Sequence, residues 1–196
     1  MNRLPLHETG SRLKKVQQTI TEMQADACII TSSVNQYWLC GFIFDGFLFL
    51  FPGGNPVLFV KRPSNIDDER AKFIRKPEQI PDLLREMGIS LPRRILIEAD
   101  QLSLTAATRL QAALNMAEIK SISGELRKIR AVKSEYELEQ MRESARIHAY
   151  VYGLIPALYH EGMTDLELQI EIERQMRLHG SVGIFRSFGE NMDIFM

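Results

Sequence analysis

Short apolar runs alternate with amphipathic helix patterns through the first 125 residues, and this alternation restricts the fold more than any other feature of the chain. Three runs have the length and composition of buried strands: 27–31, 94–98 and 118–120. Helices are predicted where apolar residues recur at spacings of three and four: 13–23, 77–87 and a segment that starts after the cap residue Ser103. The pattern predicts an α/β domain over residues 1–125, with a central sheet and helices on its faces.

A β-hairpin is expected in the middle of this domain. The apolar segments 47–51 and 57–60 flank residues 52–56, which read Pro-Gly-Gly-Asn-Pro. These residues supply turn dihedrals, and proline cannot continue the hydrogen-bond ladder of a strand. The two apolar segments are therefore predicted to be neighbouring strands joined by a turn.

Two capping boxes predict a pair of helices after the α/β domain. In the first, the Ser134 hydroxyl would accept a first-turn backbone N–H while Glu137 reaches back to the cap. The second box repeats this device with Thr164 and Glu167. Glycines at 162 and 180 are expected to end the two helices. His148 lies on the apolar face of the first helix, where a buried structural histidine is expected.

Composition and charge exclude several classes of function. The net charge of −1 gives no basic field for general nucleic-acid binding, so no nucleic acid is expected as a partner. The most apolar window, 37–51, is interrupted by two glycines and an aspartate, and the N-terminus lacks the apolar core of a secretory signal. No membrane contact is expected, and the chain is expected to be cytoplasmic. Cys28 and Cys40 form no C-x-x-C pair and are interpreted as buried, reduced thiols.

Two motif segments resemble the creatinase and prolidase group of metallopeptidases, which includes Xaa-Pro aminopeptidases and dipeptidases. One is N-x-Y-W-x-x-G-F, from Asn35 to Phe42, and the other is L-R-x-I-R-x-x-K-S-x-x-E, from Leu126 to Glu137. A third, G-x-T-D-x-E, opens the second capped helix. The resemblance implies a three-layer α/β domain with a mixed sheet over 1–125. It also implies that residues 126–196 are the incomplete start, two helices and a strand, of an α+β pita-bread catalytic domain.

The catalytic chemistry of this family is expected to lie outside the chain. Its members hold two divalent metal ions, Mn, Co or Zn, with two Asp, one His and two Glu, and the resemblance places these ligands beyond Met196. Asp193 is expected to be a strand position and not a ligand. The four histidines, His7, His148, His160 and His179, form no ligand cluster in the sequence. The sequence therefore offers no catalytic residue and no metal ligand in this chain.

The loop after the N-x-Y-W motif is the remaining candidate site. In the family this region makes dimer contacts and lends residues to the active site of the neighbouring subunit, so the resemblance implies a homodimer. The matching residues are expected to line a substrate or a dimer interface: Tyr37, Trp38, Phe42, Phe44 and Asp45. The simpler interpretation is a hydrophobic strand edge with an Asp-Gly turn at 45–46.

Two classes of function follow. In the first, the chain is the N-terminal portion of a dinuclear metal-dependent Xaa-Pro peptidase, inactive as it stands because the metal ligands are missing. Its parent would cleave a peptide or a small molecule; a small non-peptide amide or amidine such as creatine is the alternative substrate class. In the second, the chain is a non-catalytic, creatinase-like module for binding or dimerisation. The apolar C-terminal segment 192–196 favours the first, because a self-sufficient module would leave it as an unpaired hydrophobic edge.

Overall fold

The computed structural model describes residues 4–116, 118–182, 184–186 and 193–195. The chain forms two compact units, unit 1 (Met1–Val132) and unit 2 (Lys133–Met196). The boundary expected between residues 125 and 126 falls inside a helix of unit 1, so the first unit extends beyond that boundary. Among the described helices, none is both long and apolar enough to cross a bilayer.

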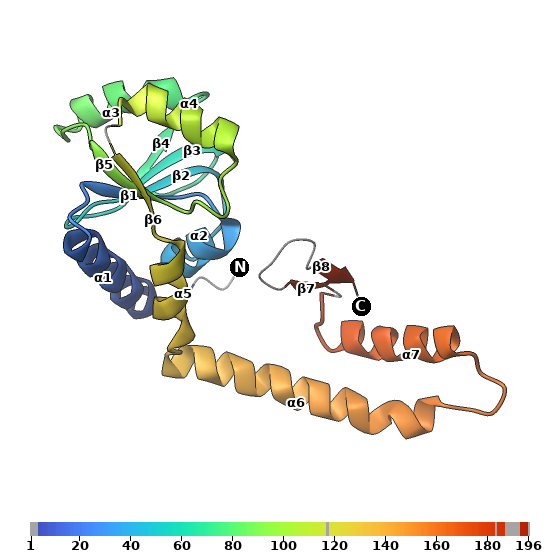
Figure 1. The fold of residues 1–196 in the computed structure, drawn as a ribbon. Helices are drawn as coiled ribbons and strands as arrows, with labels where there is room; N and C mark the ends of the chain where they lie inside the picture. Colours follow the sequence, from blue (N-terminus) through green and yellow to red (C-terminus); the bar gives the residue numbers. More distant parts are fainter. Residues whose placement is uncertain (1–3, 117, 183, 187–192, 196) are drawn as a thin grey trace. The chain divides into compact units, whose positions relative to one another are not determined.

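Unit 1 is built on a six-stranded mixed sheet with the strand order β4-β3-β2-β1-β5-β6 (Figure 1). Its strands are β1 (Ala27–Ile30), β2 (Asp45–Leu50), β3 (Val57–Arg62), β4 (Ala71–Phe73), β5 (Arg94–Ile97) and β6 (Glu118–Ser121). Strands β1, β2 and β3 pair antiparallel, which confirms the predicted hairpin. The β1–β5, β5–β6 and β3–β4 pairs are parallel. The central strand β1 therefore pairs antiparallel with β2 on one side and parallel with β5 on the other.

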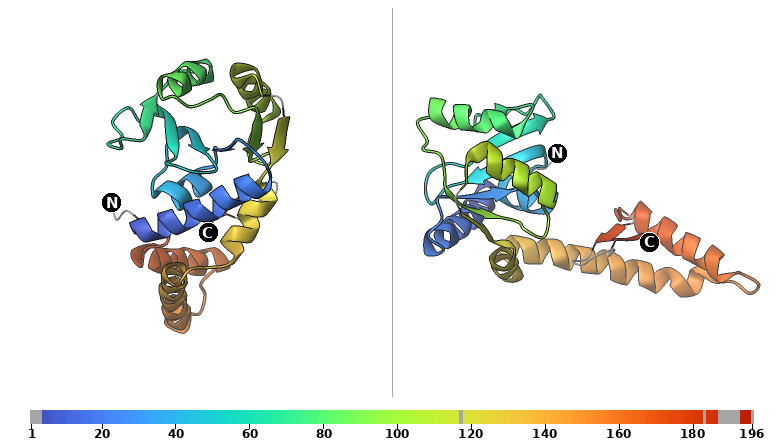
Figure 2. Two further views of the ribbon diagram at one scale, coloured as in Figure 1. Left: turned by 90° about the vertical axis from the view of Figure 1, so that its left-hand side faces the viewer. Right: turned by 45° about the horizontal axis from the view of Figure 1, so that its top comes forward.

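Helices cover both faces of this sheet, which gives the expected three layers. They are α1 (Leu6–Glu22), α2 (Ser33–Cys40), the 3-10 helix η1 (Pro77–Gln79), α3 (Ile80–Glu86), α4 (Leu104–Leu114) and α5 (Ser123–Ala131). Figures 1 and 2 show α3 and α4 on one face and α1, α2 and α5 on the other. Helix α4 starts at its predicted cap, because the Ser103 hydroxyl accepts the backbone N–H of Ala106 at 3.2 Å.

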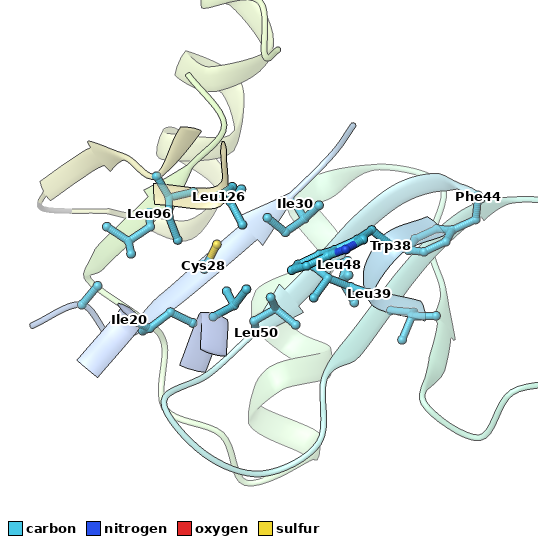
Figure 3. Close-up of a cluster of buried hydrophobic side chains, with 14 of the residues drawn as sticks. Ile20, Cys28, Ile30, Trp38, Leu39, Phe44, Leu48, Leu50, Leu96 and Leu126 are labelled. Carbon is cyan, nitrogen blue, oxygen red and sulfur yellow. The ribbon is translucent and has the colours of Figure 1, made fainter. Parts of the chain in front are cut away.

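Two hydrophobic clusters fill the spaces between the layers. Because side chains alternate across a strand, Cys28 and Ile30 of β1 enter the cluster beneath α1, α2 and α5, whereas Ile29 enters the cluster beneath α3 and α4. Figure 3 shows the first cluster, in which Trp38 of α2 lies against β2 and Leu126 of α5 lies near β1. Both helices are thereby fixed to the sheet by apolar packing.

Unit 2 consists of α6 (Glu135–Leu158), α7 (Asp165–Leu178) and the antiparallel pair β7 (Ile184–Arg186) and β8 (Asp193–Phe195). Both predicted capping boxes are confirmed: Ser134 and Thr164 accept the backbone N–H of the third residue, and Glu137 and Glu167 bond back to the caps. Helix α6 ends before Gly162, which has a positive φ of 86° and turns the chain toward α7.

The prediction of a buried histidine in unit 2 is wrong. His148 is exposed, and so are most apolar residues of the α6 face on which it lies. Val151 is the buried residue of α6, and the described part of α7 has none. The spacing of three and four predicts the helix, which forms, but within the described part of unit 2 little packs against its apolar face.

Candidate functional site

The carboxyl ends of the parallel strands β1 and β5 meet at the N-terminus of α2, and the side chain of Glu98 lies between them. Glu98 is 1% exposed. Its Oε2 accepts the backbone N–H groups of Thr31 at 2.6 Å and Ser32 at 2.8 Å. Its Oε1 accepts the Ser32 hydroxyl at 2.6 Å and the Asn35 side-chain amide at 2.5 Å. Both oxygens of this buried carboxylate are therefore engaged by donors.

This position is one at which open α/β sheets often bind ligands, because strand ends and a helix N-terminus present backbone N–H groups to an anion. Here the carboxylate of Glu98 occupies that position itself. A general base needs an oxygen available to a substrate proton, whereas those of Glu98 are held by the protein's own donors. The arrangement therefore orients α2 and does not supply an acid–base group.

A buried cation holds the opposite end of α2. The Arg12 Nη1 donates to the backbone carbonyl of Trp38 at 3.0 Å, and the guanidinium lies 5.3 Å from the centre of the Trp38 ring. Glu8 lies one turn away on α1, 3.2 Å from Arg12. The helix dipole places partial positive charge at the N-terminus and partial negative charge at the C-terminus. The Glu98 carboxylate at the first end and the Arg12 guanidinium at the second therefore both stabilise α2. Helix α2 is thus fixed at both ends by charged groups from other elements.

The loop from α2 into β2 is held by Gln36, which is fully buried. Its Oε1 accepts the backbone N–H of Phe44 at 3.3 Å, and its Nε2 donates to the Gly46 carbonyl at 3.5 Å. At Gly46 a β-carbon would lie 2.1 Å from the Phe59 carbonyl oxygen, so only glycine fits beside β3. The register shifts between Asp45 and Gly46, so this dipeptide opens β2 through a β-bulge and not through the expected Asp-Gly turn.

The structure divides the five predicted site residues into two groups. Trp38 and Phe44 are 8% and 5% exposed and belong to the hydrophobic cluster beneath α2 (Figure 3). Phe42 is partly buried, with its ring centre 5.9 Å from that of Phe44. Tyr37 is 43% exposed, and Asp45 is exposed as well. The first three residues support the loop, while the last two can meet another molecule, so a substrate or dimer contact at the loop stays a prediction for Tyr37 and Asp45.

Both cysteines are free thiols: Cys28 is buried in the hydrophobic cluster beneath α1, α2 and α5, and the partly buried Cys40 packs against that cluster. Burial raises the pKa of the Cys28 thiol well above 9.0, its ordinary value, and raises the pKa of Cys40 to about 12. This agrees with the interpretation of the two residues as reduced thiols inside the fold.

We expect both thiols of the native chain to react very slowly with a disulfide reagent at pH 8. At that pH, a thiol with a pKa near 12 has about a thousand-fold less thiolate than one with a pKa of 9.0. Denaturation should expose both groups at once in a timed absorbance assay. The raised pKa values of the two thiols in the folded chain also make its stability depend on pH. Their contribution to the free energy of unfolding is complete below pH 9.0 and is lost as the pH rises toward about 12. A thiol that reacts in the native chain at the rate of a free peptide would contradict this assignment.

Among the residues that the structure describes, no three His, Cys, Asp or Glu side chains come together in a way that could hold a metal ion. His179 is bonded locally, with Nδ1 2.8 Å from the Gln175 carbonyl oxygen. Asp193 begins β8, as expected for a strand position, and its side chain lies outside the described part. The described residues therefore do not fit the two-metal centre that the family resemblance implies.

Comparisons with known proteins agree with this fold. The model of the Creatinase/Prolidase N-terminal domain matches residues 12–132. A Bacillus subtilis protein named "Putative dipeptidase YkvY" is 25% identical over 200 residues, which cover 92% of this chain and 54% of that protein. An uncharacterized peptidase of Staphylococcus aureus (strain USA300) is 24% identical and covers 87% of this chain and 50% of its own length. The chain thus spans about half the length of the curated relatives it matches.

Solved structures show the same fold at low sequence identity. An Xaa-Pro dipeptidase from Bacillus anthracis has a TM-score of 0.75 at 14% identity and covers 96% of this chain and 57% of its own. The N-terminal domain of an X-Pro dipeptidase from Streptococcus pyogenes has a TM-score of 0.50 at 19% identity and covers 60% of this chain and 98% of its own. Since the family model covers more than half of the residues, the chain belongs to the creatinase/prolidase N-terminal domain family.

Proposed function

We propose that this chain is the N-terminal portion of a metal-dependent Xaa-Pro dipeptidase, in which unit 1 is a non-catalytic domain and unit 2 opens the catalytic domain. Relatives named as dipeptidase or peptidase support the reaction class, and each is matched over about half its length. Unit 1 supports a non-catalytic role because its one fully buried carboxylate at a strand end is saturated by structural donors. The proposed substrates are dipeptides with proline at the second position.

The apolar surface of unit 2 carries this proposal. Helix α7 has exposed Leu166, Ile170 and Leu178, which recur at multiples of four and so share one face. Helix α6 has exposed Met141 and Tyr152, which lie on the same helix face as His148. Burying a large apolar side chain contributes about 1.5–3 kcal/mol, so two helices with bare apolar stripes gain much by packing on a further layer. The rest of a catalytic domain would supply that layer.

For the complete protein we also propose two bound divalent metal ions, a homodimeric assembly and a cytoplasmic location. Two divalent ions would be held by residues of the remaining catalytic domain, because the described residues of this chain do not fit such a centre. A homodimer and a cytoplasmic location belong to the same proposal, and the exposed Tyr37 on α2 is a candidate dimer contact. No step of peptide hydrolysis is assigned to a residue of this chain.

The coding sequence that follows codon 196 tests the proposal. We expect it to continue in frame with two Asp, one His and two Glu that complete the metal centre. The protein it encodes should hydrolyse Xaa-Pro dipeptides when supplied with Mn²⁺, Co²⁺ or Zn²⁺, as measured by ninhydrin detection of released proline. Creatine in place of the dipeptide tests the alternative substrate class. A stop codon at position 197 would contradict the proposal, and so would an intact protein that binds no divalent ion.

One observation favours a second candidate, a non-catalytic binding or dimerisation module. The Streptococcus pyogenes structure is named as the N-terminal domain of an X-Pro dipeptidase, and 98% of that chain corresponds to 60% of this one. A fold of this kind can therefore exist without a catalytic domain. A stop codon directly after codon 196, together with a dimer in light scattering of the 196-residue chain over a dilution series, would favour this candidate over the first. An open reading frame that continues with the metal ligands would exclude it.

A further inference from the structure

The two motif segments on which the family resemblance rests touch one another in unit 1. Asn35 belongs to the N-x-Y-W segment on α2, and Arg130 belongs to the L-R-x-I-R segment on α5. The Arg130 Nη1 donates to the Asn35 Oδ1 at 3.1 Å, across 95 residues of sequence. The other end of the same amide donates from Nδ2 to Glu98 at 2.5 Å. A carboxylate, an amide and a guanidinium thus form one continuous chain of hydrogen bonds.

Each member of this chain fixes the orientation of the next. Glu98 is anchored by the backbone N–H groups of Thr31 and Ser32, so its carboxylate cannot rotate without breaking several bonds. Because the Glu98 carboxylate accepts only, the Asn35 amide must present its Nδ2 to Glu98 and its Oδ1 to the opposite side. That oxygen is where Arg130 binds. The negative charge of Glu98 and the positive charge of Arg130 strengthen both bonds of the bridging amide.

Arg130 lies in the last turn of α5, immediately before the chain leaves unit 1. The helix ends at Ala131, and Val132 is extended and exposed. Apolar packing holds α5 through Leu126, which is buried, and through the partly buried Ile129, and beyond these residues Ala131 and Val132 are exposed. The bond from Arg130 therefore lies where helix ends fray and where apolar packing gives way to solvent.

We propose that Arg130 and Asn35 are positioning residues that transmit the fixed orientation of α2 to the exit of the chain from unit 1. Glu98 fixes Asn35, Asn35 fixes Arg130, and Arg130 holds the last turn of α5 closed. The last turn of unit 1 is then held in place by the sheet, through α2. This role concerns unit 1 itself, so it stands whether or not the complete protein is a peptidase.

Hydrogen–deuterium exchange of the 196-residue chain tests this proposal through the amides of the last α5 turn, residues 128–131. Arg130→Met removes the donor, and we expect it to raise exchange there about ten-fold or more, the typical effect of losing a hydrogen bond to a charged group. Arg130→Lys keeps a donor and should restore most of the protection. Lys128→Met is the matched control on the same helix, since its exposed ion pair with Glu125 should change exchange less than two-fold.

A double-mutant cycle tests whether Asn35 is the residue through which Arg130 acts. Asn35→Ala should raise exchange at residues 128–131 by a factor similar to that of Arg130→Met, and the two changes together should add little, because they remove the same bond. If Asn35→Ala does not fold, the comparison of Arg130→Met with Arg130→Lys decides the question alone. Wild-type exchange in Arg130→Met, no restoration in Arg130→Lys, or strict additivity in the cycle would each overturn the proposal.

Discussion

Glu98→Ala is expected to lower the free energy of unfolding of unit 1 by about 4 kcal/mol. The substitution leaves the N–H groups of Thr31 and Ser32, together with the Asn35 amide, without the acceptor they share in a buried site. Each buried donor that loses its partner costs about 1–3 kcal/mol, and water can replace only part of the lost carboxylate. Urea unfolding followed by fluorescence suits this measurement, because Trp38 is the sole tryptophan of the chain and lies in α2.

Two further variants separate the role of the acceptors from a general effect of removing a glutamate. Glu98→Gln keeps one acceptor oxygen and should lose less stability than Glu98→Ala. Glu118→Ala removes an exposed glutamate from the neighbouring strand β6 and should change stability by less than about 0.5 kcal/mol. A Glu98→Ala chain as stable as Glu118→Ala would show that the buried carboxylate does not fix α2.

Gly46→Ala is the second substitution with a large expected effect, about 3 kcal/mol of lost stability. The added β-carbon would meet the Phe59 carbonyl oxygen at 2.1 Å, so β2 and β3 must separate at the bulge. Because the added β-carbon meets a backbone atom, no flexible side chain can move to relieve the clash. The expected loss of stability is therefore at the upper end of the range that overpacking usually causes. The same urea titration, with the midpoint and slope compared to wild type, measures the loss.

Gly53→Ala provides the matched control for this prediction. Gly53 lies in the turn between β2 and β3, and a β-carbon there would meet nothing within 4 Å. Since alanine also reduces the freedom of the unfolded chain, this variant should be neutral or slightly more stable. Equal stability of the two alanine variants would show that the close approach at Gly46 can relax without cost.

Elements with local signals could be predicted from the sequence. The helices that begin after Ser103, Ser134 and Thr164 carry their caps within four residues of their start, so sequence proximity alone specifies them. The hairpin is equally local, because its Pro- and Gly-rich turn lies between two apolar segments. The order of these elements then indicates the α/β class.

Helix α2 could not be predicted in the same way, because what fixes it comes from distant parts of the chain. The carboxylate at its N-terminus is that of Glu98, 63 residues from Asn35, and the guanidinium at its C-terminus is that of Arg12, 26 residues from Trp38. The sequence around Trp38 reads as apolar in either a helix or a strand. The Ser32 cap was the available signal, since its hydroxyl accepts the backbone N–H of Asn35.

The residues of the candidate site could also be predicted only in part. A motif containing several aromatic residues predicts that some of them are exposed, but it does not reveal which, because helix and strand periods place different residues on the buried face. In the helix that forms, Trp38 points into the core and Tyr37 to solvent. Conversely, the sequence indicated a buried face around His148, and the described part of unit 2 buries little of it.

The ends of the unit 1 sheet limit how this domain can meet other chains. Its two edge strands, β4 and β6, are only three and four residues long. Lys72 lies in the first, and Glu118 and Lys120 lie in the second. Short, charged edge strands discourage the addition of a foreign strand, which is a common route to aggregation. Any contact of unit 1 with another chain is therefore expected to use side chains on a helix or loop and not the addition of a strand to the sheet.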